Sequence, residues 1–404
     1  MRFILYHHKN RELAEYIKEY TELKKYDLSS TDEVEIVALP NTNSSATFAE
    51  LPQLLRELLY FAKPDLVICL DDGKKPIKPI FAIEITLHVP ATDHWLQRFN
   101  NLVGCAKEGV PGAYIMPFEL NQKKQFKGPI DSEFFYAYDR IMEIHKTPLY
   151  ISEWESSDGE HLNSDNKYHG LPDHDSKHIQ DTIKFINVVI DAAIRGIKIE
   201  DLMKERIFIN LRDKIRNKAY KQIPQISSYK RLAFNMPKGE YLDNKELENL
   251  IKSKGLDLPE NIPDRIIKRD KNLVFVPQVE RTGKSDDELR DALNIRIKNK
   301  GGDPYLGQPL AFDYMFCRLG PTPYERDANL VIDLSVLYFE DIAGYHKNIW
   351  ESCPLQYTDF KDLNHIPQYT MYLTKGCSQA IKNFLRMYSF AADIIIFRDG
   401  IIYF

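Results

Sequence analysis

Two short apolar runs carry the strongest structural signal in the chain: Pro64-Asp65-Leu66-Val67-Ile68-Cys69-Leu70 and Phe81-Ala82-Ile83-Glu84-Ile85-Thr86-Leu87. Both are rich in branched and aromatic residues, which is typical of buried strands. The turn signal Asp71-Asp72-Gly73 follows the first run, so the pair predicts a hairpin. Each strand carries one carboxylate, Asp65 or Glu84. A buried charge is costly unless it is paired or bound to a metal, so these two residues are candidates for chemistry.

The flanking residues predict two helices and a third strand. Apolar residues recur at three- and four-residue steps over 48–63, and Pro64 ends this helix because proline disfavours helical geometry in the residue before it. A second helix is expected over 94–108, ended by Gly109, and a strand over 112–116. The predicted order is helix, strand, strand, helix, strand.

The expected strands bring oxygen ligands together. Side chains two apart share a face of a strand, so Glu84 and Thr86 point the same way, and Asp65 at the start of the neighbouring strand can converge with them. Such hard ligands suit Mg²⁺ or Mn²⁺. Glu50 and Glu57 lie near one face of the first helix and are candidate additional ligands or, alternatively, a solvated helix face. The two central acids have alternatives too: Asp65 as a turn or strand-start residue, and Glu84 in a buried ion pair with Arg98 or Lys78.

These residues resemble the PD-(D/E)xK superfamily of metal-dependent nucleases, the fold of most restriction endonucleases. Pro64-Asp65 takes the place of the Pro-Asp of that family, and Glu84-Ile85-Thr86 takes the place of its (Asp/Glu)-x-Lys, with Thr86 where the family usually has lysine. The resemblance covers about a quarter of the chain. Gln97 and Arg98 resemble a supporting polar position on the following helix.

The resemblance implies a Mg²⁺- or Mn²⁺-dependent DNA endonuclease of the restriction or phage-defence type. Asp65 and Glu84 would hold the metal, with Thr86 and Gln97 assisting catalysis and Arg98 contacting nucleic acid. The alternative is a non-catalytic nucleic-acid-binding or assembly protein with a degenerate nuclease fold, in which Thr86 has replaced the lysine of the family. An unrelated α/β enzyme is disfavoured, because the sequence has no Gly-rich phosphate loop and no nucleophile elbow. Cleavage of both strands with one site per chain would favour a homodimer.

Composition is that of a globular protein, with 43% hydrophobic residues and a net charge of −5 over 404 residues. No apolar run approaches the ~20 residues of a bilayer span, and the N-terminus reads as a strand rather than a secretion signal, so we expect a cytoplasmic protein without membrane contact. The five cysteines are isolated, which argues against a zinc site or a disulfide framework. The histidines between 161 and 178 have no metal-ligand spacing and are expected at the surface.

Basic residues concentrate between 201 and 300, although the rest of the chain is acidic. A basic stripe is typical of phosphate binding, and the alternative is a solvated helix of alternating charge. The candidates for nucleic-acid contact in this region are Arg212, Lys214, Arg216, Lys218, Lys230 and Arg231.

The sequence therefore predicts a mixed α+β (α/β) fold with a restriction endonuclease-like αββαβ core and a further helical and α+β C-terminal region. Expected domains are a nuclease-like domain over 1–150, a helical basic region over 151–272 and a C-terminal α+β domain over 273–404, a candidate for target recognition. A helix is expected over 176–195, a strand over 330–339, a helix over 378–388 and a closing hairpin over 394–404.

Overall fold

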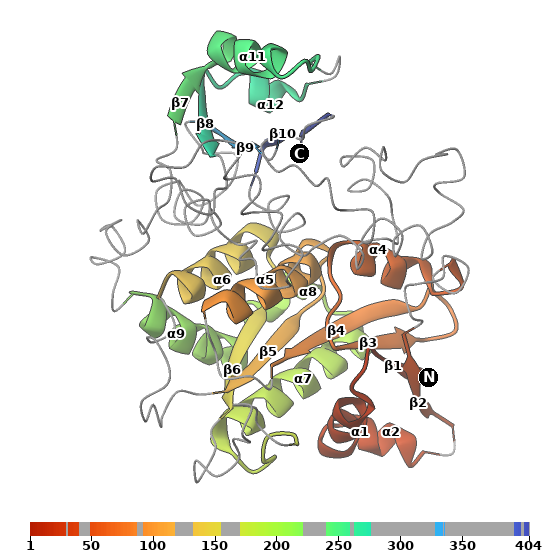
Figure 1. Cartoon of the computed structure of the whole chain (residues 1–404). Helices are drawn as coiled ribbons and strands as arrows, with labels where there is room; N and C mark the ends of the chain where they lie inside the picture. Colours follow the sequence, from red (N-terminus) through yellow and green to blue (C-terminus); the bar gives the residue numbers. More distant parts are fainter. Residues whose placement is uncertain are drawn as a thin grey trace. The chain divides into compact units, whose positions relative to one another are not determined.

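A computed structural model describes twelve stretches of the chain: residues 1–29, 31–39, 49–86, 92–117, 132–154, 170–220, 240–258, 262–275, 328–333, 335, 392–396 and 400–403. The chain divides into two compact units near residue 222. The protein is a mixed α and β protein, and its described strands form two sheets, one in each unit (Figure 1). Within the described residues, no helix is both long and apolar enough to cross a membrane.

Six strands form the sheet of the first unit. They are β1 (Arg2–His7), β2 (Glu33–Ala38), β3 (Leu66–Asp71), β4 (Lys78–Ile85), β5 (Gly112–Pro117) and β6 (Leu149–Trp154). Their order across the sheet is β2-β1-β3-β4-β5-β6. β1 is parallel to β2 and antiparallel to β3, β3 and β4 form an antiparallel hairpin, and β5 and β6 continue parallel to β4. The hairpin predicted from the two apolar runs is confirmed at the centre of this sheet.

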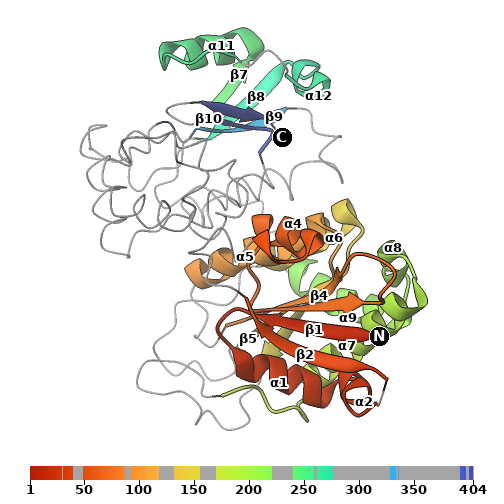
Figure 2. The same cartoon turned by 90° about the vertical axis from the view of Figure 1, so that its right-hand side faces the viewer.

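Helices cover both faces of the sheet (Figures 1 and 2). One face carries α4 (Gln53–Phe61), α5 (Thr92–Lys107) and α6 (Ser132–His145), and the other carries α1 (Arg11–Tyr20), α2 (Leu23–Asp27) and α7 (Lys177–Arg195). After the short α8 (Ile199–Leu202), α9 (Arg206–Tyr220) packs against α6, α7 and β6. The order α4, β3, β4, α5, β5 is the predicted helix-strand-strand-helix-strand.

Local sequence explains where these helices begin and end. Pro52 precedes α4, so this helix is shorter than the expected 48–63, and its cap Ala62 lies two residues before Pro64. Ser176 caps α7 by accepting from the backbone N–H of Ile179, and Gly196 ends it with a φ of 68°, a left-handed conformation that glycine adopts without strain. The helix expected over 176–195 is thus confirmed.

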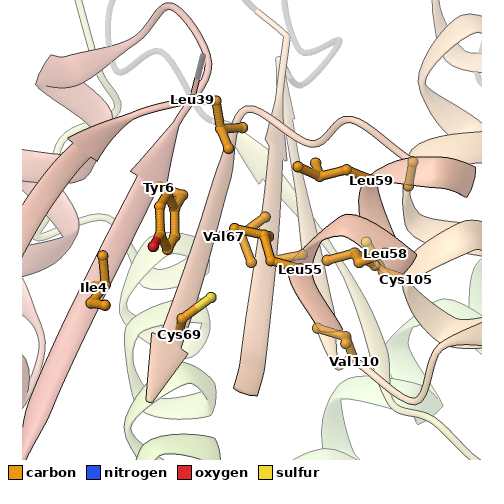
Figure 3. Packing of buried hydrophobic residues seen from close by; sticks show 12 residues of the cluster. Ile4, Tyr6, Leu39, Leu55, Leu58, Leu59, Val67, Cys69, Cys105 and Val110 are labelled. Atoms are coloured by element: carbon orange, nitrogen blue, oxygen red, sulfur yellow. The ribbon is translucent and has the colours of Figure 1, made fainter. Parts of the chain in front are cut away.

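Side chains of α4 and of the sheet together form the hydrophobic core under this helix (Figure 3). Leu55, Leu58 and Leu59 of α4 pack on Val67 and Cys69 of β3, and all five side chains are buried. Burying a leucine side chain contributes about 1.5 to 3 kcal/mol. This packing fixes the helix that leads into Pro64 and hence the start of β3.

The second unit holds a smaller mixed sheet. Its strands are β7 (Glu240–Asp243), β8 (Lys271–Phe275), β9 (Asn329–Asp333), β10 (Ile394–Ile396) and β11 (Ile401–Tyr403), in the order β11-β10-β9-β8-β7. The core of this unit combines these strands with α11 (Asn244–Ser253) and α12 (Asp264–Ile267). β8, β9 and β10 are parallel, and β10 and β11 form the predicted closing hairpin. The first part of the strand expected over 330–339 is seen as β9, while most of its remainder and the helix expected over 378–388 lie outside the described residues.

The domain boundaries expected at 150 and 272 differ from this division into two units. β6 crosses position 150 and pairs with β5, and α7 packs on β4 and β6, so the first unit continues past 150. β8 begins at Lys271 and pairs with β7, so residues on both sides of 272 belong to one sheet. Strand pairing between distant segments, which local composition does not reveal, decides both boundaries.

Candidate functional site

Strand register brings the two predicted carboxylates opposite each other. Leu66 of β3 pairs with Ile83 of β4 in the antiparallel hairpin. One residue further along, Asp65 therefore faces Glu84. Directly opposite residues of an antiparallel pair share a face, with Cβ atoms about 5 Å apart. The convergence of Asp65 and Glu84 expected from the sequence is thus present.

The backbone holds Asp65 in place from two sides. Its side-chain Oδ2 accepts a hydrogen bond from the N–H of Ile85 at 2.9 Å, and its carbonyl accepts one from the N–H of His8 at 3.0 Å. Asp65 thereby joins the ends of β1, β3 and β4. Its side chain is half-buried and lies against the backbone of Ile85, the residue after Glu84.

Glu84 is completely buried under α5, and both of its oxygens have partners. Arg98 donates from Nη1 to Oε1 at 2.6 Å, and Asn101 donates from Nδ2 to Oε2 at 3.0 Å. The Oδ1 of Asn101 accepts from the backbone N–H of Lys63 at 3.1 Å. One amide side chain therefore ties Glu84 to the segment that leads into Asp65. The ion pair with Arg98, one of the two alternatives for Glu84, is confirmed.

Burial raises the pKa of both acids. The pKa of Glu84 is raised to about 8, chiefly by burial and also by the charge of Asp65, while Arg98 opposes the rise. Burial also raises the pKa of Asp65, against the opposing charges of Arg98 and Lys63. The attraction of Glu84 raises the pKa of Arg98, so its guanidinium stays charged. The charge of Asp65 thus adds to burial in disfavouring the ionised form of Glu84.

We expect Glu84 to make folding stability fall as pH rises. Its pKa is raised from 4.5 to about 8 in the folded protein, so between these values the folded state binds more protons than the unfolded state. The free energy of unfolding must then decrease with pH across this window. Glu84→Gln should flatten the decline, measured by urea denaturation at several pH values. The exposed Glu12→Gln is the control, and an unchanged slope in Glu84→Gln would contradict the expectation.

Basic groups that the sequence did not single out surround the two acids. The pKa of Lys63 is lowered to about 8, first by burial and then by Lys9. The pKa of His8 is lowered to about 4 by burial, with Lys63, Lys9 and Arg98 adding to the effect. His8 is therefore neutral near neutral pH. Lys63 was identifiable in the sequence as a lysine two residues before Asp65, whereas His8 reaches the site only through the pairing of β1 with β3.

Thr86 follows Glu84 on the same face and is almost fully buried. Its N–H donates to the carbonyl of Ile115 at 3.0 Å, and its side chain contacts Tyr114. Tyr114 is paired with Glu84 across β4 and β5, so it belongs to the same cluster. The backbone of Gln97 lies in α5, but its side chain is outside the described part of the structure.

The two additional acids of the first helix do not join this site. Glu50 is exposed and precedes α4, which begins at Gln53. Glu57 accepts a hydrogen bond from Gln53 at 3.0 Å, and its charge adds to the effect of burial, which raises the pKa of Glu108 near the end of α5. The expectation that either residue supplements Asp65 and Glu84 finds no support in these contacts.

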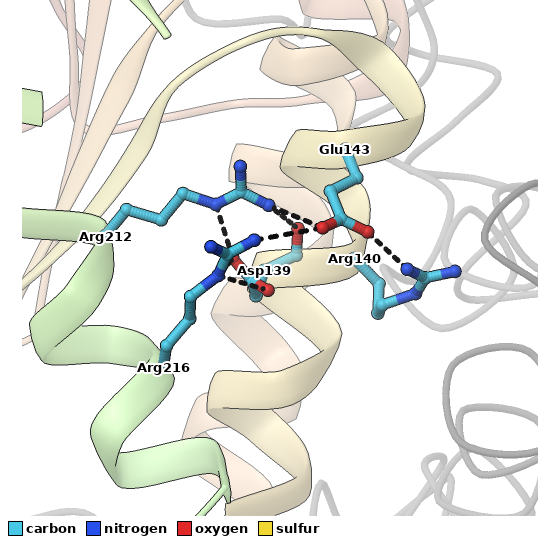
Figure 4. A network of polar contacts seen from close by, with 5 residues as sticks. All are labelled: Asp139, Arg140, Glu143, Arg212 and Arg216. Carbon is cyan, nitrogen blue, oxygen red and sulfur yellow. Dashed lines mark hydrogen bonds and ion pairs between the residues drawn. The ribbon is translucent and has the colours of Figure 1, made fainter. Parts of the chain in front are cut away.

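Arg212 and Arg216 of α9, two of the arginines expected to meet phosphate, form ion pairs with acids of α6 (Figure 4). Arg212 donates from Nε to Asp139 at 2.5 Å and from Nη2 to Glu143 at 2.9 Å. Arg216 reaches the same two acids, at 3.1 Å from Nε and 3.0 Å from Nη2. Arg140 pairs with the second oxygen of Glu143. The two α9 arginines thus bind α9 to α6, which neither a phosphate stripe nor a solvated helix predicts.

Among the other basic candidates in this region, one forms an ion pair, and the side chains of the rest lie outside the described residues. Lys214 pairs with Asp181 of α7. Lys218 lies in α9, with its side chain outside the described residues, and Lys230 and Arg231 fall outside them altogether. A nucleic-acid role for these residues stays a prediction.

Asp65 and Glu84 offer the hard carboxylate oxygens that Mg²⁺ and Mn²⁺ prefer. A second possible cation position exists in the described part of the chain, where ligand atoms of Asp173, His174 and Asp175 lie within 4.8 Å of one another. Both aspartates are exposed and His174 stacks on Tyr20, which is an ordinary surface arrangement. Of these two groups of residues, the first combines a fully buried Glu84 with a half-buried Asp65, held by named partners at the ends of central strands.

Comparison with known proteins assigns the chain to no family. No protein-family model, curated protein or solved structure gave a match. What this chain does must therefore be argued from the arrangement of Asp65, Glu84 and the groups around them.

Proposed function

We propose that the first unit is a Mg²⁺- or Mn²⁺-dependent endonuclease that hydrolyses phosphodiester bonds in DNA, as the resemblance to PD-(D/E)xK nucleases implies. The observation that carries this proposal is the convergence of Asp65 and Glu84 on one face at the ends of β3 and β4. The elements in the order α4, β3, β4, α5 and β5 support it, because that order suits the family core.

The donor set suits a divalent cation. Ionisation of Glu84 would place a second negative charge beside Asp65 in a buried position, which helps to raise the pKa of Glu84 to about 8, and one guanidinium contacts Glu84. Such an arrangement is unfavourable for stability alone, since buried charges need full compensation. A divalent cation between the acids would supply the missing positive charge. The carboxylates therefore have a reason to be there beyond the fold.

Each residue has a distinct role in this proposal. Asp65 and Glu84 hold the metal, which when bound lowers the pKa of a water molecule and stabilises charge on the phosphate. Lys63 and Arg98 supply positive charge beside the acids, where the phosphate of a substrate would lie. Thr86 offers a hydroxyl and no positive charge, so these two residues take over the electrostatic part that a lysine at position 86 would play.

A second candidate function rests on one specific observation. Arg98 and Asn101 occupy both oxygens of Glu84, which a purely structural cluster in a non-catalytic nucleic-acid-binding or assembly protein would also show. In that case Glu84 orients α5 and binds no metal. The two candidates differ in whether cleavage occurs at all.

Metal dependence separates the two candidates. Incubation of the full chain with plasmid DNA and Mg²⁺ or Mn²⁺ should produce nicked and linear forms on a gel, and EDTA should stop the reaction. Phosphodiester hydrolysis without the ion lacks the activated water, so the rate should fall to background. Single-stranded DNA and RNA, tested in parallel, define the substrate. Undiminished cutting in EDTA would contradict the metal mechanism, and binding of DNA without cutting would favour the second candidate.

A further inference from the structure

We infer that Arg98 occupies the carboxylate pair as long as no divalent cation is bound there. When a cation binds, the guanidinium leaves Glu84 and contacts the substrate phosphate. The inference rests on the proposed function and concerns how its site is opened. Its basis is the contact between Arg98 Nη1 and Glu84 Oε1 at 2.6 Å, at the point where Asp65 and Glu84 converge.

A cation and Arg98 compete for the same carboxylate. Arg98 is attracted by both Glu84 and Asp65, so its guanidinium already occupies the region of negative potential between α5 and the strand ends. A divalent ion near the same oxygens would repel the guanidinium, and the repulsion is strong at short range in a buried site. Metal binding and the 2.6 Å contact therefore exclude each other.

The two partners of Glu84 differ in their freedom to move. Asn101 is buried and also holds the backbone of Lys63, so its position is fixed from two sides. The side chain of Arg98 is 37% exposed, so its guanidinium can turn toward solvent. Asn101 keeps Glu84 oriented while Arg98 exchanges, which makes the arginine the movable part of the site.

The released guanidinium has a second use. Arginine binds phosphate oxygens in a bidentate manner, so a DNA phosphate beside the metal offers Arg98 a new partner. Phosphate binding then draws Arg98 away from Glu84 and raises the affinity for the metal. By thermodynamic linkage, the metal raises the affinity for DNA by the same factor. Metal and DNA should therefore bind cooperatively, and the cooperativity should depend on Arg98.

Mn²⁺ binding to the full chain tests this inference without requiring activity. Free Mn²⁺ is measured by electron paramagnetic resonance, with and without a DNA duplex whose phosphorothioate linkages resist hydrolysis. For the native chain, the duplex should raise Mn²⁺ affinity. Arg98→Gln should bind Mn²⁺ about tenfold more tightly than the native chain without DNA, and the duplex should add little. Asp65→Asn combined with Arg98→Gln should lose this binding, which locates the ion.

Arg2→Gln is the matched control, because Arg2 is 39% exposed and pairs with Asp71 on the same sheet away from the site. It should leave Mn²⁺ binding unchanged. If Arg98→Gln does not fold, Arg98→Lys keeps a charge with weaker geometry and should bind Mn²⁺ a few-fold more tightly. Native affinity and a native response to the duplex in these variants would overturn the inference and leave the metal site standing. Absence of Mn²⁺ binding in every variant would overturn the proposed function itself.

Discussion

Asp65→Asn is expected to abolish metal-dependent DNA cleavage while leaving the fold intact. The asparagine Oδ1 can still accept the hydrogen bond from Ile85, so the junction between β3 and β4 is kept. A neutral amide lowers the negative charge available to a divalent cation, and with it the activation of water. We expect cleavage to fall by on the order of 10³-fold or more, which corresponds to ~4 kcal/mol of barrier.

Initial rates of plasmid nicking in Mg²⁺ measure this loss, and thermal unfolding followed by circular dichroism checks the fold. Asp71→Asn is the matched control: Asp71 ends the same strand, is part-buried and pairs with Arg2 at 2.9 Å. It should cut at the native rate. Native-rate cleavage by Asp65→Asn would move the site elsewhere, and unfolding of Asp65→Asn would show that Asp65 is a structural residue.

The central part of the fold was predictable because its signals are local. Pro64 and Gly109 end helices, and the apolar runs on either side of Asp71-Asp72-Gly73 are continuous and bounded. A hairpin joins neighbours in sequence, so its register follows from the turn and the pattern. Asp65 and Glu84 come together through this short-range pairing, which is why the sequence indicated them.

Long-range pairing was beyond such signals. β2 reads Glu33-Val34-Glu35-Ile36-Val37-Ala38, and nothing in these residues indicates a parallel partner such as β1. His8 joins the site through the pairing of β1 with β3, and Asn101 joins it from the helix turn after Arg98. The spacing of Arg98 and Asn101 on one helix face could have been recognised, because residues three apart are neighbours on a helix. Their target on the sheet could not.

In the basic segment over 201–300, too, contacts between distant parts of the chain could not be predicted from the sequence. Arg212 and Asp139 are separated by 73 residues, so a count of charges along the chain does not show the ion pairs that Arg212 and Arg216 make with this acid. The composition of a segment gives its net charge but does not show which acids of other elements form ion pairs with it. The acids that neutralise Arg212 lie on α6, in a region that the composition of residues 201–300 does not include.

Arg212→Ala is therefore expected to destabilise the first unit. Its partner Asp139 is fully buried, and Arg212 itself is only 15% exposed, so the substitution leaves a buried carboxylate with Arg216 as its remaining cation. Breaking a buried ion pair from one side costs about 3 to 5 kcal/mol. With Arg216 still present, we expect a loss of about 3 kcal/mol, measured as a lower urea midpoint with an unchanged slope.

Lys214→Ala on the same helix is the matched control. Lys214 is 42% exposed and pairs with Asp181, so its loss should cost less than about 1 kcal/mol, as exposed ion pairs do. DNA binding across a salt series distinguishes the phosphate interpretation of Arg212. If Arg212→Ala kept native stability and reduced the slope of log K against log salt by about 0.9, the arginine would be a phosphate contact. A loss of stability with an unchanged salt slope assigns it to the junction of α6 and α9.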